Sequence, residues 1–157
     1  MFARCKNRLA RSIICGACCL LPGITGWKLN KNDTNSEWIR TCLLQSFNQA
    51  AIPLKKWEIS VGPEGFFRLK KYFAGGKQEY FSFNFKRLKD IKYEGTNDSG
   101  SVVFTTINDD IIVQTYNDPK GNIDSMSTVL ALPVLNMSME KLDSLRNMAG
   151  RLKERSE

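Results

Sequence analysis

The side chains that could perform chemistry in this chain are few, because its 157 residues include no histidine. Histidine is the commonest general acid or base near neutral pH and the usual partner of a serine or cysteine nucleophile. Two short motifs remain whose side chains could perform chemistry without histidine. In Ser138-Met-Glu-Lys141 a lysine one helical turn away could deprotonate a serine, and Cys15-Gly-Ala-Cys18 has the two-residue gap of a zinc knuckle or a redox pair.

The spacing of Ser138 and Lys141 resembles that of the penicillin-recognising serine enzymes. This resemblance implies a serine nucleophile with a lysine base, but the companion Ser-Asp-Asn and Lys-Thr-Gly motifs are absent from the sequence. A serine that starts a helix is usually an N-cap, whose hydroxyl accepts a hydrogen bond from a backbone amide. We therefore expect a non-catalytic protein without a cofactor, with an enzyme of unrecognised type as the last alternative.

The cysteines and aspartates do not form a recognisable metal site. A structural zinc site needs four ligands, and beyond Cys15 and Cys18 the sequence supplies neither a second spaced pair nor a histidine. Cys42 falls on the apolar face of a predicted helix, where a thiol behaves as a small hydrophobic side chain. A calcium ion could bind the aspartates of two neighbouring turns, which are Asp109, Asp110, Asp118 and Asp124. Their spacing does not match an EF-hand loop. We expect no metal site.

The first 26 residues have the three parts of an export signal. Residues 1–11 supply positive charge, residues 12–21 form an apolar segment, and residues 22–26 break a helix and offer small side chains. A membrane-spanning helix needs about 20 apolar residues, and this run ends sooner. We predict that residues 1–26 are an export signal or a short membrane anchor, and that the protein is secreted, periplasmic or associated with the cell envelope.

Within this segment, Gly16-Ala17-Cys18 resembles the signal of bacterial lipoproteins, in which small residues precede the acylated cysteine. The resemblance implies a lipid on Cys18. The aliphatic residue that usually stands three places before that cysteine is Cys15 here. Removal of the whole segment would instead leave Cys42 as the sole thiol, which excludes an internal disulfide framework.

Formal charge is unevenly distributed along the chain. Of the net charge of +7, residues 1–26 carry +4 and no acidic side chain. Residues 55–93 carry ten lysines and arginines against four acids, whereas residues 94–126 carry one lysine against six acids. The globular part is therefore dipolar rather than uniformly basic, and nucleic acid is not the partner we expect for an exported protein.

Apolar spacing predicts one amphipathic helix near each end of the globular part. A polar linker over residues 27–35 leads into Thr34-x-x-Glu37, the pattern of a capping box, and into a helix over residues 36–50. Its predicted buried face is Trp38, Ile39, Cys42, Leu43 and Phe47. A last helix is predicted to begin after Ser138 and to bury Leu142, Leu145, Ala149 and Leu152.

Between these helices the apolar period changes to two, which predicts strands. Turn residues separate seven such segments: residues 55–61, 66–73, 80–85, 88–93, 102–106, 111–116 and 126–134. We predict a single globular α+β domain over residues 36–157, mainly antiparallel, built as a seven-strand meander or a small barrel. This element order is similar to that of pleckstrin-homology-like and lipocalin-like barrels, although no residue motif supports either.

Basic and aromatic side chains interleave along the second and third predicted strands and the turn that follows. The six that we take as a candidate binding face are Arg68, Lys70, Tyr72, Tyr80, Lys86 and Arg87. The pattern suits an anionic headgroup, an envelope component or a partner protein, and it also suits the ordinary polar outside of an antiparallel sheet. We predict a binding module, a monomer or weak oligomer that touches membranes only through its N-terminal segment.

The alternative function is that of a barrel that carries an apolar small molecule. Its lining would be the inward phenylalanines and their neighbours, Phe67, Leu69, Phe73, Phe81, Phe83 and Phe85. A barrel of about eight strands or fewer can also be filled by its own side chains, which would make these residues plain core.

Overall fold

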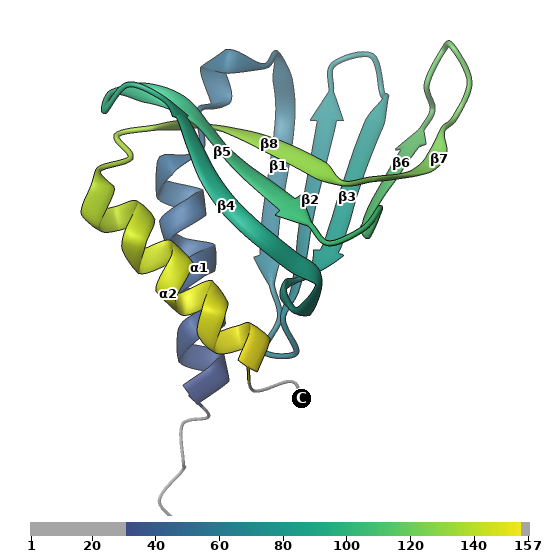
Figure 1. The fold of residues 1–157 in the computed structure, drawn as a ribbon. Coiled ribbons are helices and arrows are strands. Elements are labelled where there is room, and N and C mark those ends of the chain that lie inside the picture. The colour runs from purple at the N-terminus through teal and green to yellow at the C-terminus, as the bar shows by residue number, and fades with distance from the viewer. Residues whose placement is uncertain (1–30, 155–157) are drawn as a thin grey trace, which may run out of the picture.

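Residues 31–154, which the computed structural model describes, form two helices and eight strands (Figure 1). Two single turns of 3-10 helix, η1 and η2, lie between them. In chain order the elements are α1 (Lys31–Ser46), η1 (Gln49–Ala51), β1 (Leu54–Val61), β2 (Phe66–Phe73), β3 (Gln78–Asn84), η2 (Phe85–Arg87), β4 (Leu88–Gly95), β5 (Ser99–Thr106), β6 (Ile111–Tyr116), β7 (Asp124–Ser127), β8 (Val129–Leu135) and α2 (Met139–Glu154).

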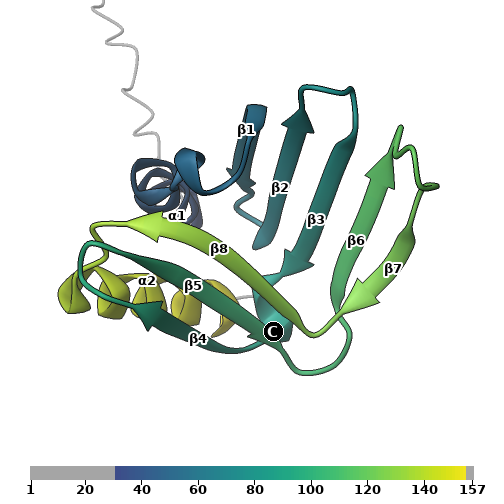
Figure 2. The ribbon, with the colours of Figure 1, turned by 90° about the horizontal axis from the view of Figure 1, so that it is seen from above.

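The strands form two antiparallel sheets rather than one meander. A large sheet has the order β1-β2-β3-β6-β7, and a small sheet has the order β4-β5-β8. The small sheet lies across one face of the large sheet at a steep angle, and α1 and α2 lie side by side at one end (Figure 1, Figure 2). The predicted antiparallel α+β class is confirmed. The predicted barrel is wrong, since neither sheet of the described residues closes on itself.

The chain changes sheets at three corners, between β3 and β4, between β5 and β6 and between β7 and β8, which is why the predicted meander does not form. After β3, the Asn84 side chain accepts a hydrogen bond from the backbone N–H of Lys86 at 2.9 Å, which fixes the turn into η2 and β4. The third corner is Thr128, which divides the predicted strand 126–134 into β7 and β8. Its carbonyl accepts a hydrogen bond from the backbone N–H of Thr106 at 2.9 Å. β7 therefore belongs to the large sheet and β8 to the small one.

Helix α1 begins at Lys31, earlier than predicted, so residues 31–35 of the predicted linker are helical. The predicted capping box does not form, because Thr34 already lies inside the helix. Glu37 instead accepts a hydrogen bond from Arg40 at 2.8 Å, one turn further along. The predicted buried face is confirmed for its main members, which are Ile39, Cys42, Leu43 and Phe47.

The predicted export signal, residues 1–26, and its possible lipid-attachment site Cys18 lie outside the described residues. Within residues 31–154, neither helix is long and apolar enough to cross a membrane.

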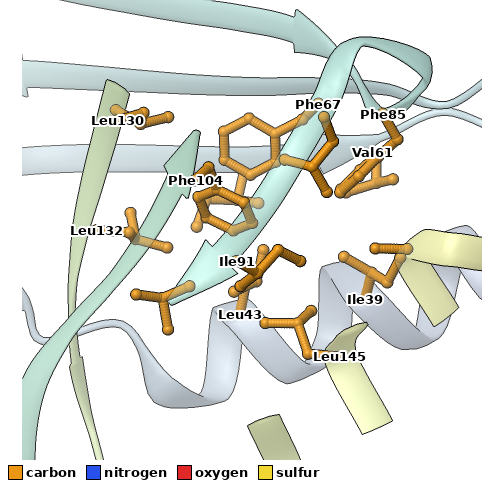
Figure 3. Close-up of a cluster of buried hydrophobic side chains, with 14 of the residues drawn as sticks. Ile39, Leu43, Val61, Phe67, Phe85, Ile91, Phe104, Leu130, Leu132 and Leu145 are labelled. Carbon is orange, nitrogen blue, oxygen red and sulfur yellow. The ribbon is translucent and has the colours of Figure 1, made fainter. Parts of the chain in front are cut away.

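Four phenylalanines fill the space between the two sheets (Figure 3). The rings of Phe67 and Phe83 stack at 5.1 Å between centroids, and Phe83 lies 5.4 Å from Phe85 and 5.5 Å from Phe104. All four are at most 1 % exposed. Three of the five phenylalanines that the carrier hypothesis placed around a ligand, Phe67, Phe83 and Phe85, therefore pack within this cluster. The other two, Phe73 and Phe81, are half-buried, and each has a lysine Nζ over its ring. Each buried aromatic ring removes a large apolar area from water, so this cluster contributes strongly to stability.

Helix α2 packs against α1 and along the open edge of β4. Its predicted stripe is buried, and Ser138 caps its first turn by accepting a hydrogen bond from the backbone N–H of Lys141 at 3.3 Å. Arg146 Nε donates to the carbonyl of Ile91, and Lys153 Nζ donates to that of Leu88, each at 2.9 Å. These bonds satisfy backbone carbonyls on a strand that has no neighbouring strand on that side.

Candidate functional site

One face of the large sheet carries most of the candidate binding residues. Along β2, Phe67 and Leu69 point into the core, so the alternating residues Arg68, Lys70 and Tyr72 point the other way. No other element of residues 31–154 covers this side of the sheet (Figure 2). We call it the outer face. Tyr80 of β3 is directly opposite Lys70 and lies on the same side. The outer face therefore contains four of the six predicted binding residues.

Lysines lie over tyrosine rings on the outer face. Lys70 Nζ lies 5.6 Å from the centroid of the Tyr80 ring, and Lys56 Nζ of β1 lies 5.5 Å from that of Tyr72. Both distances are within the range of a cation–π attraction, which is worth about 0.5–1 kcal/mol at exposed sites. These contacts hold the tyrosine rings between charged neighbours.

The structure adds three residues that sequence reasoning missed. Gln78 of β3 is paired with Tyr72 on one side and with Tyr116 of β6 on the other, and Gln114 of β6 is paired with Tyr80. Tyr116 is 46 % exposed. The alternation within residues 111–116 placed Gln114 and Tyr116 on one face of a strand, but nothing in the sequence indicated that this strand pairs with β3.

Lys86 and Arg87 do not join this set. Both lie in η2, beyond the end of β3. Arg87 Nε donates to a carboxylate oxygen of Asp110 at 3.0 Å, and this hydrogen bond holds the pKa of Asp110 below its usual value. Arg87 therefore links η2 to the loop before β6, and the structure gives it an internal partner.

The outer face is less positive than the sequence indicated. Lys56 forms an ion pair with Glu58 at 2.5 Å, which lowers the pKa of Glu58, and Arg68 lies 3.7 Å from a carboxylate oxygen of Glu64. Lys70 has no carboxylate partner within 4.0 Å among the described residues. One lysine near the centre of the face is thus available to a ligand.

A shallow hollow lies at the centre of the outer face, where β2, β3 and β6 meet. Its volume is about 400 Å³, and its lining is Lys70, Gln78, Tyr80, Gln114 and Tyr116, together with Glu79, whose side chain lies on the inner side of the sheet. We call it the tyrosine hollow. Its lining alternates aromatic rings with amide and charged groups, so it can offer both a flat apolar surface and hydrogen bonds.

A second depression, of about 710 Å³, lies between α1 and the end of β1. Its lining surface is mostly apolar, with Trp38, Val61 and Pro63, and Glu37 is the one charged side chain that residues 34–154 contribute to it. That carboxylate already accepts hydrogen bonds from Arg40 and from a threonine of the same helix. This depression therefore offers a ligand little beyond apolar contact.

The residues that could have been catalytic have structural partners. The Ser138 hydroxyl caps α2, as predicted. Cys42 is buried, and burial raises the pKa of its thiol, which makes it a poor nucleophile. Among residues 31–154, no group of three or more acidic or thiol side chains is arranged to hold a metal ion. The aspartates of the turns bind separate partners, as Asp118 does with Lys77 at 2.9 Å.

Comparisons with protein-family models, with curated proteins and with solved structures gave no match to this chain.

Proposed function

We propose that residues 31–154 form a non-catalytic binding module of an exported protein, and that the outer face of the large sheet is its contact surface. One observation carries the proposal: three of the four tyrosines in the chain, Tyr72, Tyr80 and Tyr116, lie on this one face. Tyrosine offers a large, rigid and amphipathic contact area with little loss of side-chain entropy, and it is enriched at binding surfaces.

The rest of the molecule is consistent with this role. Three rings that a carrier would need to line its cavity, Phe67, Phe83 and Phe85, pack against one another in the core. The Ser138 hydroxyl is engaged in capping a helix, and the Cys42 thiol is buried. The partner class that we propose is an envelope component, met after export through the predicted signal of residues 1–26.

Photo-crosslinking in cells that produce the protein naturally tests the proposed surface. A benzoylphenylalanine placed at Gln78, on the central strand β3 of the outer face, should give covalent adducts. The matched control position is Lys92, which is exposed on β4 of the small sheet, and it should give none. Equal adducts from the two positions, or adducts from Lys92 alone, would place the contact surface elsewhere.

The intact mass and the N-terminal sequence of the native protein test the proposed compartment. We expect a mature chain that has lost the leader or that begins at an acylated Cys18. A soluble intracellular chain that still begins at Met1 would contradict export.

A further inference from the structure

We infer that the tyrosine hollow binds a sugar unit of an envelope glycan that is neutral or carries a single carboxylate. This inference rests on the proposed function of the outer face and names its ligand. The volume of about 400 Å³ falls within the range of about 300–1,000 Å³ that is usual for small-molecule sites. A hollow of this size accommodates one or two sugar rings.

The strand register brings three aromatic rings around one amide. Tyr72, Gln78 and Tyr116 form one row across β2, β3 and β6, and Tyr80 lies two residues further along β3. Tyr80 is thus the diagonal neighbour of both other tyrosines, at a spacing of about 7–8 Å. A pyranose ring is flat, with C–H groups on its faces, and it can stack on a tyrosine ring in such a set.

Hydrogen-bonding groups stand beside these rings. Gln114 is held in place, because its Oε1 accepts from the Tyr116 hydroxyl at 3.1 Å and its Nε2 donates to Asp124 at 3.3 Å. The side-chain amide of Gln78 and the hydroxyl of Tyr80 have no hydrogen bond to any other part of residues 31–154. They can therefore donate to and accept from the hydroxyl groups at the rim of a sugar.

The charge of the outer face argues against a polyanionic ligand. Recognition of anionic lipid surfaces typically uses four to eight clustered basic residues, and single-stranded nucleic acid needs a positively charged groove. Here Lys56 and Arg68 are paired with glutamates, and Lys70 is the one cation that the described part of the chain places in the lining of the hollow. A single lysine matches a hydroxyl group or one carboxylate.

The position of the hollow argues against an added peptide strand. Peptides that extend a sheet bind at its edge, where backbone groups are unpaired. The hollow lies on β2, β3 and β6, which are flanked by β1 and β7. A ligand here must be recognised by side chains, as a sugar would be.

The test is a glycan array probed with the purified protein, followed by titration of the best glycan. We expect binding to neutral or singly acidic glycans that changes little with salt. Tyr80→Ala and Tyr116→Ala should each weaken it at least about tenfold, equivalent to about 1.4 kcal/mol, whereas Tyr80→Phe keeps the ring and should retain most affinity. The matched control is Lys92→Ala on the small sheet, which should bind as the wild type does. Circular dichroism verifies that each variant is folded.

Three results would overturn the inference. One is binding restricted to highly sulfated glycans and abolished by salt, which would indicate a polyanion site. Another is binding that Tyr80→Ala and Tyr116→Ala leave unchanged. The third is a complete absence of glycan binding while Gln78 still crosslinks in cells, which would leave the outer face as a contact surface for another class of partner. If the crosslinks are absent as well, the proposed function fails together with the inference.

Discussion

Lys71 and Glu79 face each other across β2 and β3 on the inner side of the large sheet, with Lys71 Nζ 3.7 Å from Glu79 Oε2. The Lys71 side chain is only 10 % exposed, and its Nζ lies 4.6 Å from the centroid of the Phe81 ring. Burial lowers the pKa of Lys71, and the carboxylate of Glu79 opposes this only in part. The folded protein therefore holds this positive charge at a net cost.

The two partners should respond differently to substitution. Lys71→Met removes a poorly solvated charge, and Glu79 keeps Lys77 at 3.1 Å as its partner, so stability should change by less than about 1 kcal/mol. Glu79→Gln leaves the Lys71 ammonium without its counter-charge and should cost about 1–3 kcal/mol. Urea unfolding measures both values, with Lys70→Met on the outer face as the control. A larger loss from Lys71→Met than from Glu79→Gln would show that the lysine charge stabilises the fold.

The lowered pKa of Lys71 also predicts a pH dependence. Because the pKa in the folded protein lies below the usual 10.5, the unfolded chain binds the extra proton between these two values. Below the pKa of Lys71 in the folded protein, the buried charge destabilises the fold to its full extent. The free energy of unfolding rises as the pH increases from that pKa toward the unfolded value. Unfolding free energies measured from about pH 7 to pH 10 should rise more steeply for the wild type than for Lys71→Met. Parallel curves for the two proteins would refute this assignment.

The aromatic cluster between the sheets should dominate stability. Phe104 is fully buried and lies 5.5 Å from Phe83 and 5.6 Å from Phe67, so Phe104→Ala should cost about 3–5 kcal/mol. Phe66 on the outer face is 37 % exposed, and Phe66→Ala should cost about 1 kcal/mol or less. Equal losses for the two variants in urea unfolding would be inconsistent with a core centred between the sheets.

Helix α2 should protect the open edge of β4 through two cationic side chains. The double variant Arg146→Ala, Lys153→Ala loses hydrogen bonds to two backbone carbonyls and should be destabilised by about 1–3 kcal/mol. It should also aggregate faster on warming, as light scattering would detect, because an uncovered strand edge can pair with another chain. Arg151→Ala in the last turn of the same helix is the control. If the control aggregates as fast, edge protection is not the cause.

The capping role of Ser138 can be separated from a catalytic one. Ser138→Ala should cost about 1 kcal/mol, and Ser138→Asp, which can still accept the backbone hydrogen bond, should cost less. A fluorophosphonate probe should not label the wild type. Labelling at Ser138 that disappears in Lys141→Met would instead establish an activated serine.

Local pattern in the sequence was enough to locate most elements. The period of two over residues 66–73 determined a strand with Phe67 and Leu69 on one side and Lys70 and Tyr72 on the other. The stripe that includes Leu142 and Leu145 determined the last helix in the same way. In both cases the spacing matches the repeat of one regular element, so no distant contact was needed.

Only the tertiary structure decided how those elements meet. Tyr116 lies near Tyr80 because β6 pairs with β3, although β4 and β5 of the small sheet lie between them in the sequence. Such a pairing depends on packing between distant segments rather than on local periodicity. The charge of the outer face was misjudged for the same reason, since Glu64 approaches Arg68 only once the turn between β1 and β2 has formed. The sequence determined which residues face outward, and the pairing of the strands decided which of them form the hollow.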